Sequence, residues 1–345
     1  MLWEQEAADS LGLDWTTMLI RPTGVSGPRN RVLHEIDVPS PGYDTRTWVA
    51  FRRRFYAFLE KLDPAPDVLL LRYNVHDPFL ARFVSTRSNV VTVHHAVESS
   101  ELAARGDRAA PVKRAFERRL GRMTLNHVAG IVGVTQEILD YEVARRVENL
   151  PPTFVYPNGR LVDDPALLDR RHGIRLAFVA SEFASWMGLE DLLHALLDHS
   201  GEVTLDVVGP LSEAQRDLCA RDSRVRPLGV LGQIELGELL EEASVGVATL
   251  RVDRKGLKQS CTLKVRDYLA AGVPVVSGHD DVFPDDFPYY RRTGTDIDAI
   301  LAAAHEWRSV DRVTVREAAR PHIDKVELVR RLHGELVAAY AAADA

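Results

Sequence analysis

The segment from Gln259 to Val276 carries the residue types best suited to hold an anion. Its pattern predicts a helix, a glycine turn and a buried strand in direct succession. Thr262 is the expected cap, because a hydroxyl can accept an unpaired N–H of the first turn. Lys264 follows within that turn. Helix dipole, free amides and fixed charge together favour phosphate, so the amides of Thr262 and Leu263 with Lys264 are the predicted site. The alternative is an ordinary surface lysine.

Asp267 lies one turn further along the same predicted helix. Its carboxylate can accept hydrogen bonds from two vicinal hydroxyls, or it can pair with a neighbour as a solvated helix residue. Leu263, Tyr268 and Leu269 are expected to share the buried stripe of this helix.

Two adjacent histidines, His94 and His95, end an apolar run in the first half of the chain. Imidazole can donate to one hydroxyl and accept a proton from another near neutral pH. Alternation along a strand points the two side chains to opposite faces, so at most one acts. The alternative is a histidine packed at the strand end. Glu98 and Glu101 in the following loop are candidates to orient a bound hydroxyl.

Clusters of acidic residues are weak indications of a metal site here. Asp296 and Asp298 directly precede an amphipathic pattern, which favours helix capping. The pairs at 280–281 and 285–286 lie in a loop that contains proline, and we expect them to be solvated. No paired-histidine spacing is present. We therefore predict no metal.

A basic amphipathic pattern covers Arg46–Leu62, with a second basic helix at Lys113–Arg122. Such a helix can lie on an anionic membrane. The alternative is a core-facing stripe with a solvated edge.

The composition describes an ordinary globular protein long enough for two domains: 345 residues, 46% hydrophobic and 27% charged. A net charge of −7 argues against nucleic acid as a partner. Two cysteines indicate no disulfide framework and favour the cytosol. No run approaches ~18 apolar residues, and the N-terminus does not resemble a signal peptide.

Strand and helix patterns alternate almost throughout, which predicts an α/β protein with parallel sheets. Strands are expected near 15–20, 32–38, 68–72, 90–94, 130–134, 154–156, 176–180, 204–208, 225–228, 245–249 and 273–277. Helices are expected near 46–62, 78–84, 111–127, 136–147, 189–198, 213–220, 236–242, 262–271, 298–307 and 325–342.

These elements predict two doubly wound, Rossmann-like domains facing across a cleft at the carboxyl ends of their strands. The expected divisions are 1–157, a linker at 158–173, a second domain at 174–324, and a final helix at 325–345 that returns toward the first domain. Residues 3–13 already read as a helix, so the first domain is expected to lack its first strand and loop.

The second half resembles group-1 (family-4) nucleotide-sugar glycosyltransferases, including a subgroup with a Trp-x-Gly-Leu loop. The resemblance rests on the order and spacing of several motifs. They are Pro157-Asn158-Gly159, the strand at 176–181, Trp186-Met187-Gly188-Leu189, Val208-Gly209-Pro210, Leu228-Gly229, Asp253–Leu257 and Gln259–Val276. No G-x-G-x-x-G follows any strand, which argues against a nicotinamide dehydrogenase.

The resemblance implies the GT-B fold, with the nucleotide-sugar bound in the second domain. The family carries two glutamates at the positions of Gln259 and Asp267, which contact the transferred sugar and the ribose respectively. It also carries an Arg and a Lys after the domain's first strand, where this chain has 181–188 without a cation. Arg254 and Lys255 are the expected replacements, although a solvated basic turn fits them equally well. A buried diphosphate requires some cation.

Taken together, the predicted donor-binding residues are Ser181, Gly188, Gly209, Gly229, Arg254, Lys255, Gln259, Ser260, Thr262, Leu263, Lys264 and Asp267. By resemblance His94 or His95 and Lys264 are the catalytic candidates, with Glu98 and Glu101 on the acceptor side. The predicted activity is metal-independent, retaining sugar transfer from a nucleotide-diphosphate sugar, without a cofactor, in cell-envelope or exopolysaccharide synthesis. The expected partners are that donor and a glycan or lipid-linked acceptor, with peripheral contact at the inner membrane face.

Two alternatives remain open. One is a non-catalytic, glycosyltransferase-like partner or scaffold protein, which would explain the substitutions at Gln259 and Asp267. The other is a sugar-nucleotide epimerase on the same fold.

Overall fold

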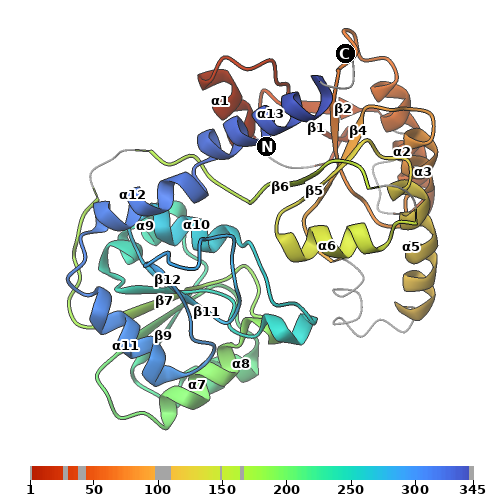
Figure 1. The fold of residues 1–345 in the computed structure, drawn as a ribbon. Helices are drawn as coiled ribbons and strands as arrows, with labels where there is room; N and C mark the ends of the chain where they lie inside the picture. Colours follow the sequence, from red (N-terminus) through yellow and green to blue (C-terminus); the bar gives the residue numbers. More distant parts are fainter. Residues whose placement is uncertain are drawn as a thin grey trace. The chain divides into compact units, whose positions relative to one another are not determined.

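The computed structural model describes residues 2–25, 30–37, 44–97, 110–147, 150–163 and 167–341. It divides into two compact units (Figure 1). Unit 1 contains residues 1–156 and 329–345, and unit 2 contains residues 157–328. The predicted linker at 158–173 thus lies inside unit 2. Glu98 and Glu101 lie outside the described residues.

Unit 1 alternates strands and helices as far as Tyr156 and then receives part of the last helix. Its elements in chain order are α1 (Leu2–Ser10), β1 (Leu19–Pro22), β2 (Leu33–Ile36), α2 (Thr45–Leu59), β3 (Leu69–Arg72), α3 (Pro78–Val84), β4 (Val90–His94), α5 (Ala110–Leu125), β5 (Gly130–Gly133), α6 (Gln136–Ala144) and β6 (Thr153–Val155), followed by most of α13 (Lys325–Ala341).

The strands of unit 1 form two parallel sheets: β1 pairs with β2, and β3-β4-β5-β6 form the second sheet in that order. The apolar face of α2 contributes to the core beside this sheet. Tyr56 and Leu59 are buried with Leu80 and Ile131, and Phe55 packs against them. In the last helix, the hydroxyl of Tyr340 donates to the carbonyl oxygen of Ala129 at 2.9 Å.

Unit 2 repeats the alternation around one larger sheet. Its elements are β7 (Arg175–Val179), η1 (Ser185–Met187), α7 (Leu189–Leu197), β8 (Thr204–Val208), α8 (Glu213–Cys219), β9 (Val225–Gly229), α9 (Gln233–Glu242), β10 (Val245–Val247), η2 (Val252–Lys255), α10 (Leu263–Ala270), β11 (Val275–Ser277), β12 (Tyr290–Arg292), α11 (Ile297–Trp307) and α12 (Arg312–Ile323).

All pairings in the unit 2 sheet are parallel, and the strand order is β12-β11-β10-β7-β8-β9. The chain proceeds from β7 to β8 on one side, whereas β10 pairs with β7 on the other. Strand order therefore reverses at β7, which makes the carboxyl ends of β7 and β10 the topological switch point.

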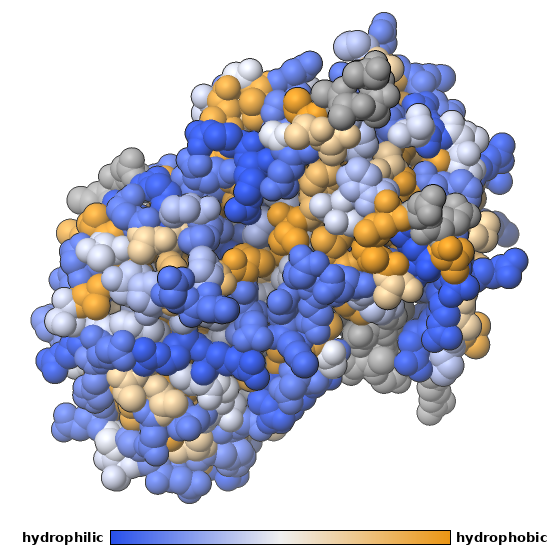
Figure 2. Space-filling model, viewed as in Figure 1, coloured by the Kyte–Doolittle hydropathy of each residue, from blue (hydrophilic) through white to orange (hydrophobic). Residues whose placement is uncertain are grey.

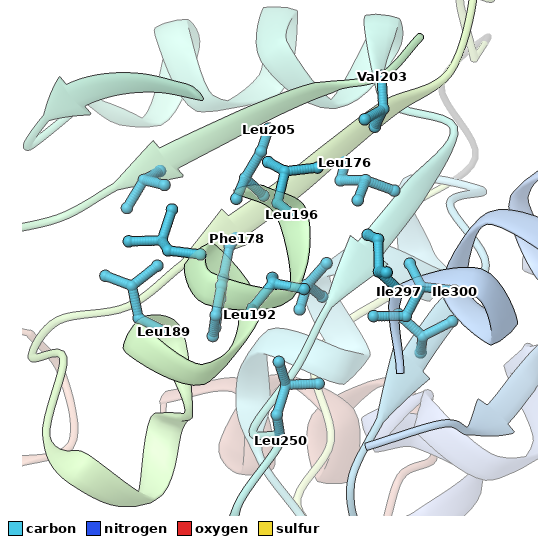
Figure 3. Close-up of a cluster of buried hydrophobic side chains, with 14 of the residues drawn as sticks. Leu176, Phe178, Leu189, Leu192, Leu196, Val203, Leu205, Leu250, Ile297 and Ile300 are labelled. Atoms are coloured by element: carbon cyan, nitrogen blue, oxygen red, sulfur yellow. The ribbon is translucent and has the colours of Figure 1, made fainter. Parts of the chain in front are cut away.

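Buried aliphatic side chains fix the strands of unit 2 against their helices (Figure 3). Phe178 and Leu205 from the sheet pack with Leu192 of α7 and Ile300 of α11, and all four are fully buried. Burial of one such side chain contributes roughly 1.5–3 kcal/mol, so this cluster holds β7 and the loop after it in place.

Besides the short 3₁₀ segments η1 and η2, two elements were not predicted. The edge strand β12 is only three residues long. Helix α12 has a proline at Pro321, but it still buries Val315, Ala319 and Ile323 on one face.

Candidate functional site

A pocket of about 240 Å³ lies at the switch point of unit 2. Its walls come from the loop after β7, the segment after β10 and the start of α10. The lining residues are Ala180, Ser181, Glu182, Ala184, Trp186, Met187, Thr249, Val252, Lys255, Ser260, Thr262 and Lys264. In open parallel sheets this edge is where ligands bind, and this pocket contains four of the predicted donor-binding residues along with Lys264.

The amine of Lys264 projects among uncharged groups. Its Nζ lies 3.8 Å from the sulfur of Met187 and 5.8 Å from the ring centroid of Phe178. Among the described residues no carboxylate lies within ion-pair distance of it. Burial lowers the pKa of Lys264 to about 7, since desolvation disfavours the charged form. An anion in the pocket would supply the missing counter-charge.

The start of α10 leaves its first amides without a side-chain cap. Thr262 occupies the cap position with extended backbone, but its hydroxyl accepts no first-turn N–H. The predicted capping bond is therefore wrong, because Thr262 Oγ1 is buried without a partner beside the pocket. Uncapped amides at a helix start attract anions.

One part of the predicted stripe on α10 also needs correction. Tyr268 and Leu269 are buried, but Leu263 is 50% exposed. Leu263 is the first residue of α10, and the buried residues of this helix begin only at Val265.

The residues before α10 are held by Asn158, from the Pro-Asn-Gly motif. Its backbone N–H donates to Cys261 Sγ at 3.1 Å and its side-chain amide donates to the carbonyl oxygen of Cys261 at 2.6 Å. Burial raises the pKa of Cys261 to about 12, so the sulfur is a thiol. Arg266 Nε donates to the carbonyl oxygen of Asn158 at 3.0 Å. Asn158 therefore positions the start of the helix.

Asp281 was expected to be solvated, and this prediction is wrong. Its side chain is fully buried and accepts from both terminal nitrogens of Arg266 at 2.6 Å each. A carboxylate this deep requires a cation, which Arg266 provides. Asp285 and Asp286 are exposed as predicted.

Arg254 and Lys255, the cations expected near the diphosphate, differ in position. Arg254 donates to the carbonyl oxygen of Ser185 at 2.6 Å and to Asp191 Oδ1 at 2.8 Å, and it does not line the pocket. Lys255 does line it, with Nζ 5.4 Å from the ring centroid of Trp186. Of these two cations, only Lys255 lines the pocket.

Neither Gln259 nor Asp267 lines the pocket. Asp267 accepts from Arg160 at 2.9 Å. Burial raises the pKa of Asp267, and Arg160 offsets part of that rise. Gln259 pairs with Asp280 in an isolated parallel bridge, and the next N–H, from Ser260, donates to the carbonyl oxygen of Asp280 at 3.0 Å.

Glycine is required at two of the predicted positions. Gly209 has φ of +135°, and a β-carbon there would overlap the carbonyl oxygen of Ala180. Gly188 has φ of +77° between η1 and α7, where a β-carbon would lie 2.9 Å from Leu250. Both residues let the segments around the pocket approach closely. Gly229 ends β9 with φ of +68° and has open space beside it.

Ser181 and Glu182 follow β7 and are both exposed at the pocket. Glu182 is the one carboxylate among the lining residues. Glu182 was not predicted, and neither were the Met187 sulfur and the Phe178 ring beside Lys264. Only contacts across the fold identify them.

The two adjacent histidines, His94 and His95, have opposite environments, as alternation predicts. His94 is fully buried, stacks on Tyr73 with ring centroids 4.5 Å apart, and has Nδ1 3.4 Å from Glu142 Oε1. Its Nε2 lies 3.0 Å from Thr92 Oγ1. These are the contacts of a core histidine. His95 is the exposed member of the pair.

Part of the basic face of helix α2 is buried inside unit 1. Arg52 is buried, donating through Nε to Asp77 at 2.7 Å, and Tyr56 donates to the same carboxylate at 2.8 Å. This arrangement supports the core-facing interpretation of α2. Across the described ranges, no helix is both long and apolar enough to cross a membrane.

Asp296 caps α11 as predicted, since its side chain accepts from the N–H of Ala299 at 3.1 Å. Asp298 lies 3.2 Å from His199.

No protein-family model and no curated protein matches this chain. Solved structures do. Sucrose-phosphate synthase from Thermosynechococcus elongatus matches with a TM-score of 0.67 at 16% identity, over 98% of this chain and 92% of that one. The lipopolysaccharide outer core galactosyltransferase WaaB matches with a TM-score of 0.61 at 12% identity, over 89% and 84%. HepE from Anabaena, solved with UDP, matches with a TM-score of 0.60 at 13% identity, over 89% and 86%.

Sequence identities this low do not allow an activity to be transferred to this chain. The structural matches nevertheless extend over most of each chain. Both units are built from parallel sheets with alternating helices. The chain therefore has the α/β fold of the GT-B glycosyltransferases, built from Rossmann-like parallel sheets.

Proposed function

We propose that this protein is a glycosyltransferase that moves a sugar from a nucleotide-diphosphate sugar to an acceptor hydroxyl. The observation that carries the proposal is Lys264. Its amine lies in a pocket at the switch point, without a carboxylate partner among the described residues, next to the uncapped start of α10. Helix amides and a fixed cation converging on one pocket suit a diphosphate.

In this proposal the diphosphate occupies the Lys264 side of the pocket. When the bond between the anomeric carbon and the phosphate oxygen breaks, negative charge grows on the leaving diphosphate. Lys264, the first amides of α10 and Lys255 stabilise that charge, which lowers the barrier because these groups are already oriented. The acceptor oxygen bonds to the anomeric carbon, and its proton passes to the departing diphosphate.

We further propose retention of the anomeric configuration, no metal and no cofactor, as the motif resemblance implies. The acceptor would be a glycan or a lipid-linked sugar in cell-envelope or exopolysaccharide synthesis, with peripheral membrane contact. His95 is the histidine to test on the acceptor side, because His94 is enclosed in the core of unit 1.

The test is a thermal-shift screen of the purified protein against uridine, guanosine and adenosine diphosphates and their sugar conjugates. Ligand that binds only the folded state raises the melting temperature by mass action. The Lys264→Ala variant should lose the ligand-induced shift, measured against its own unliganded melting temperature, and Lys264→Arg should keep much of the shift. Product analysis with the stabilising donor then measures turnover.

Absence of any shift with every nucleotide would overturn the proposal and favour the scaffold alternative. Binding without transfer to any acceptor would also favour it. Conversion of a nucleotide-sugar to its epimer without an acceptor would favour the epimerase alternative.

A further inference from the structure

Lys264 differs from a surface lysine in that its amine reaches the pocket among apolar groups. The Nζ atom lies near the sulfur of Met187 and the ring of Phe178, at 3.8 Å and 5.8 Å. The face of unit 2 in view is otherwise largely hydrophilic (Figure 2), and a lysine on such a surface is solvated and protonated. Burial instead lowers the pKa of Lys264 to about 7. An unprotonated amine, the form that acts as a nucleophile, is therefore present at neutral pH.

The other titratable groups at the pocket leave this amine without a partner among the described residues. Glu182 lines the same pocket but forms no ion pair with Lys264. Lys255 of η2 is a second cation of the lining. In the loop after β11, burial lowers the pKa of His279, so that ring is neutral at pH 7. None of these groups returns Lys264 to the fully charged state of an ordinary lysine.

The pocket combines apolar walls with groups that suit an anion. Trp186, Met187 and Val252 supply apolar surface. Thr262 Oγ1 is buried without a partner, the start of α10 has no side-chain cap, and Lys255 adds a cation. The volume of about 240 Å³ is roughly eight times the share of one water molecule in the liquid. A small molecule with a short carbon group and a phosphate fits this description.

We propose that Lys264 is acylated by small acyl phosphates that bind in this pocket. The first amides of α10, Thr262 and Lys255 hold the phosphate, while the unprotonated Nζ attacks the carbonyl carbon. A C–N bond forms and the C–O bond to phosphate breaks. The phosphate leaves with that electron pair and takes up the proton that the amine loses. The products are an amide on Lys264 and inorganic phosphate, so no oxidant or reductant is required.

Acylation removes the charge of the lysine. The amide is also larger than the amine, so it fills part of the pocket. A modified protein therefore lacks the cation proposed for the diphosphate, and abundant acyl phosphate would close the site to nucleotide. The reaction itself needs only the amine and a place for phosphate, so it does not depend on the glycosyltransferase assignment.

The test is peptide mass spectrometry of the whole protein after incubation with acetyl phosphate, with the exposed Lys61 as the reference. A lysine in water keeps roughly one amine in 2,500 unprotonated at pH 7, so we expect acetylation of Lys264 to be at least about tenfold faster. Its rate should level off above about pH 8, whereas an ordinary lysine gains up to about pH 10. Pyrophosphate should slow the labelling of Lys264 and leave that of Lys61 unchanged.

A second reagent, acetic anhydride, carries no phosphate and isolates the contribution of the anion-binding groups. The preference for Lys264 over Lys61 should be smaller with it. Lys255→Gln should slow acetylation of Lys264 by acetyl phosphate about threefold, and acetylation by the anhydride less. The matched control is Lys258→Gln, at an exposed lysine that does not line the pocket, and it should change neither rate.

Equal labelling of Lys264 and Lys61 by acetyl phosphate, or no protection by pyrophosphate, would overturn the proposal. Selective labelling of Lys264 in a protein that no nucleotide or nucleotide-sugar stabilises would support it and count against the glycosyltransferase. Failure of the one is thus distinguished from failure of the other.

Discussion

The guanidinium of Arg266 and the carboxylate of Asp281 form a two-bond ion pair with both side chains fully buried, at 2.6 Å for each bond. Arg266 also donates to the carbonyl oxygen of Asn158. The pair thus joins α10 to the loop after β11 and to the first turn of unit 2. Because Lys264 lies two residues before Arg266, this pair also fixes the helix that carries the predicted phosphate site.

Replacing Asp281 should be costly, because it leaves the Arg266 charge buried without a partner. We expect Asp281→Asn to lower the free energy of unfolding by about 3–5 kcal/mol, measured by denaturant titration. The control Asp285→Asn, at an exposed carboxylate, should change it by less than about 0.5 kcal/mol. A double variant, Arg266→Met with Asp281→Leu, should recover part of the loss. Equal effects at 281 and 285 would contradict the buried pair.

Nucleotide binding should weaken as the pH rises above 7. The pKa of Lys264 is about 7 in the free protein, and a bound diphosphate raises it by attraction. Below pH 7 the amine is already charged, so binding is strongest there. Above it binding must take up a proton, and affinity falls by up to about tenfold per pH unit. Titration calorimetry from pH 7 to 9 measures this slope, and Lys264→Arg should flatten it. If Lys264→Arg leaves the pH dependence of affinity unchanged, that dependence comes from a group other than Lys264.

The amine of Lys264 should make the free energy of unfolding rise with pH, whereas it makes nucleotide affinity fall with pH. Its folded pKa is lowered from 10.5 to about 7, so the unfolded chain binds more protons between these values. Stability without ligand should therefore rise with pH across this window. Lys264→Met should reduce that rise when the free energy of unfolding is followed from pH 7 to 10. The expected contribution would be refuted by parallel curves for the two proteins.

Gly209 should tolerate no side chain. A β-carbon there would overlap the carbonyl oxygen of Ala180, and φ is +135°, so Gly209→Ala should cost at least about 2 kcal/mol and displace the loop after β7. Gly237 in α9 has nothing within 4 Å of its added β-carbon. Gly237→Ala should therefore stabilise by about 0.5–1 kcal/mol. Thermal unfolding compares the two variants. An unchanged melting temperature for Gly209→Ala would disprove the close approach of Gly209 to the carbonyl oxygen of Ala180.

Removing the carboxylate of Glu182 should strengthen diphosphate binding. Glu182 lines the pocket together with Lys264, and like-charge repulsion in a partly solvated site is worth roughly 0.5–1 kcal/mol. We expect Glu182→Gln to lower the dissociation constant of a nucleoside diphosphate about threefold, while Glu238→Gln at an exposed position of α9 has no effect. If the affinity falls instead, Glu182 contacts a neutral or cationic part of the ligand.

Local patterns predicted most elements, because their signals lie within a few residues. Helix α3 is an example: Asp77 accepts from the N–H groups of Phe79 and Leu80, and Pro78 follows the cap. Strand β12 escaped prediction because two half-exposed residues followed by one exposed residue give no alternation. Helix α12 escaped because Pro321 and several charges obscure its apolar face.

The site was predictable only where it depends on sequence neighbours. Lys264 at the start of α10 followed from the helix pattern. Its environment did not, because Met187 and Phe178 lie far from it in the sequence. Arg254 and Lys255 are adjacent and indistinguishable in the sequence, yet only Lys255 reaches the pocket. The tertiary contacts of Arg254 with Ser185 and Asp191 decide between them.

Unit 2 is one uninterrupted stretch of chain, from residue 157 to residue 328, whereas unit 1 needs residues from both sides of it. This arrangement sets an order for folding during synthesis. The complete unit 2 can emerge from the ribosome and fold while unit 1 still lacks its last helix. Unit 1 is complete only once the last helix is made and Tyr340 can donate to the carbonyl oxygen of Ala129. Premature termination near residue 330 would therefore leave the pocket of unit 2 intact and destabilise unit 1.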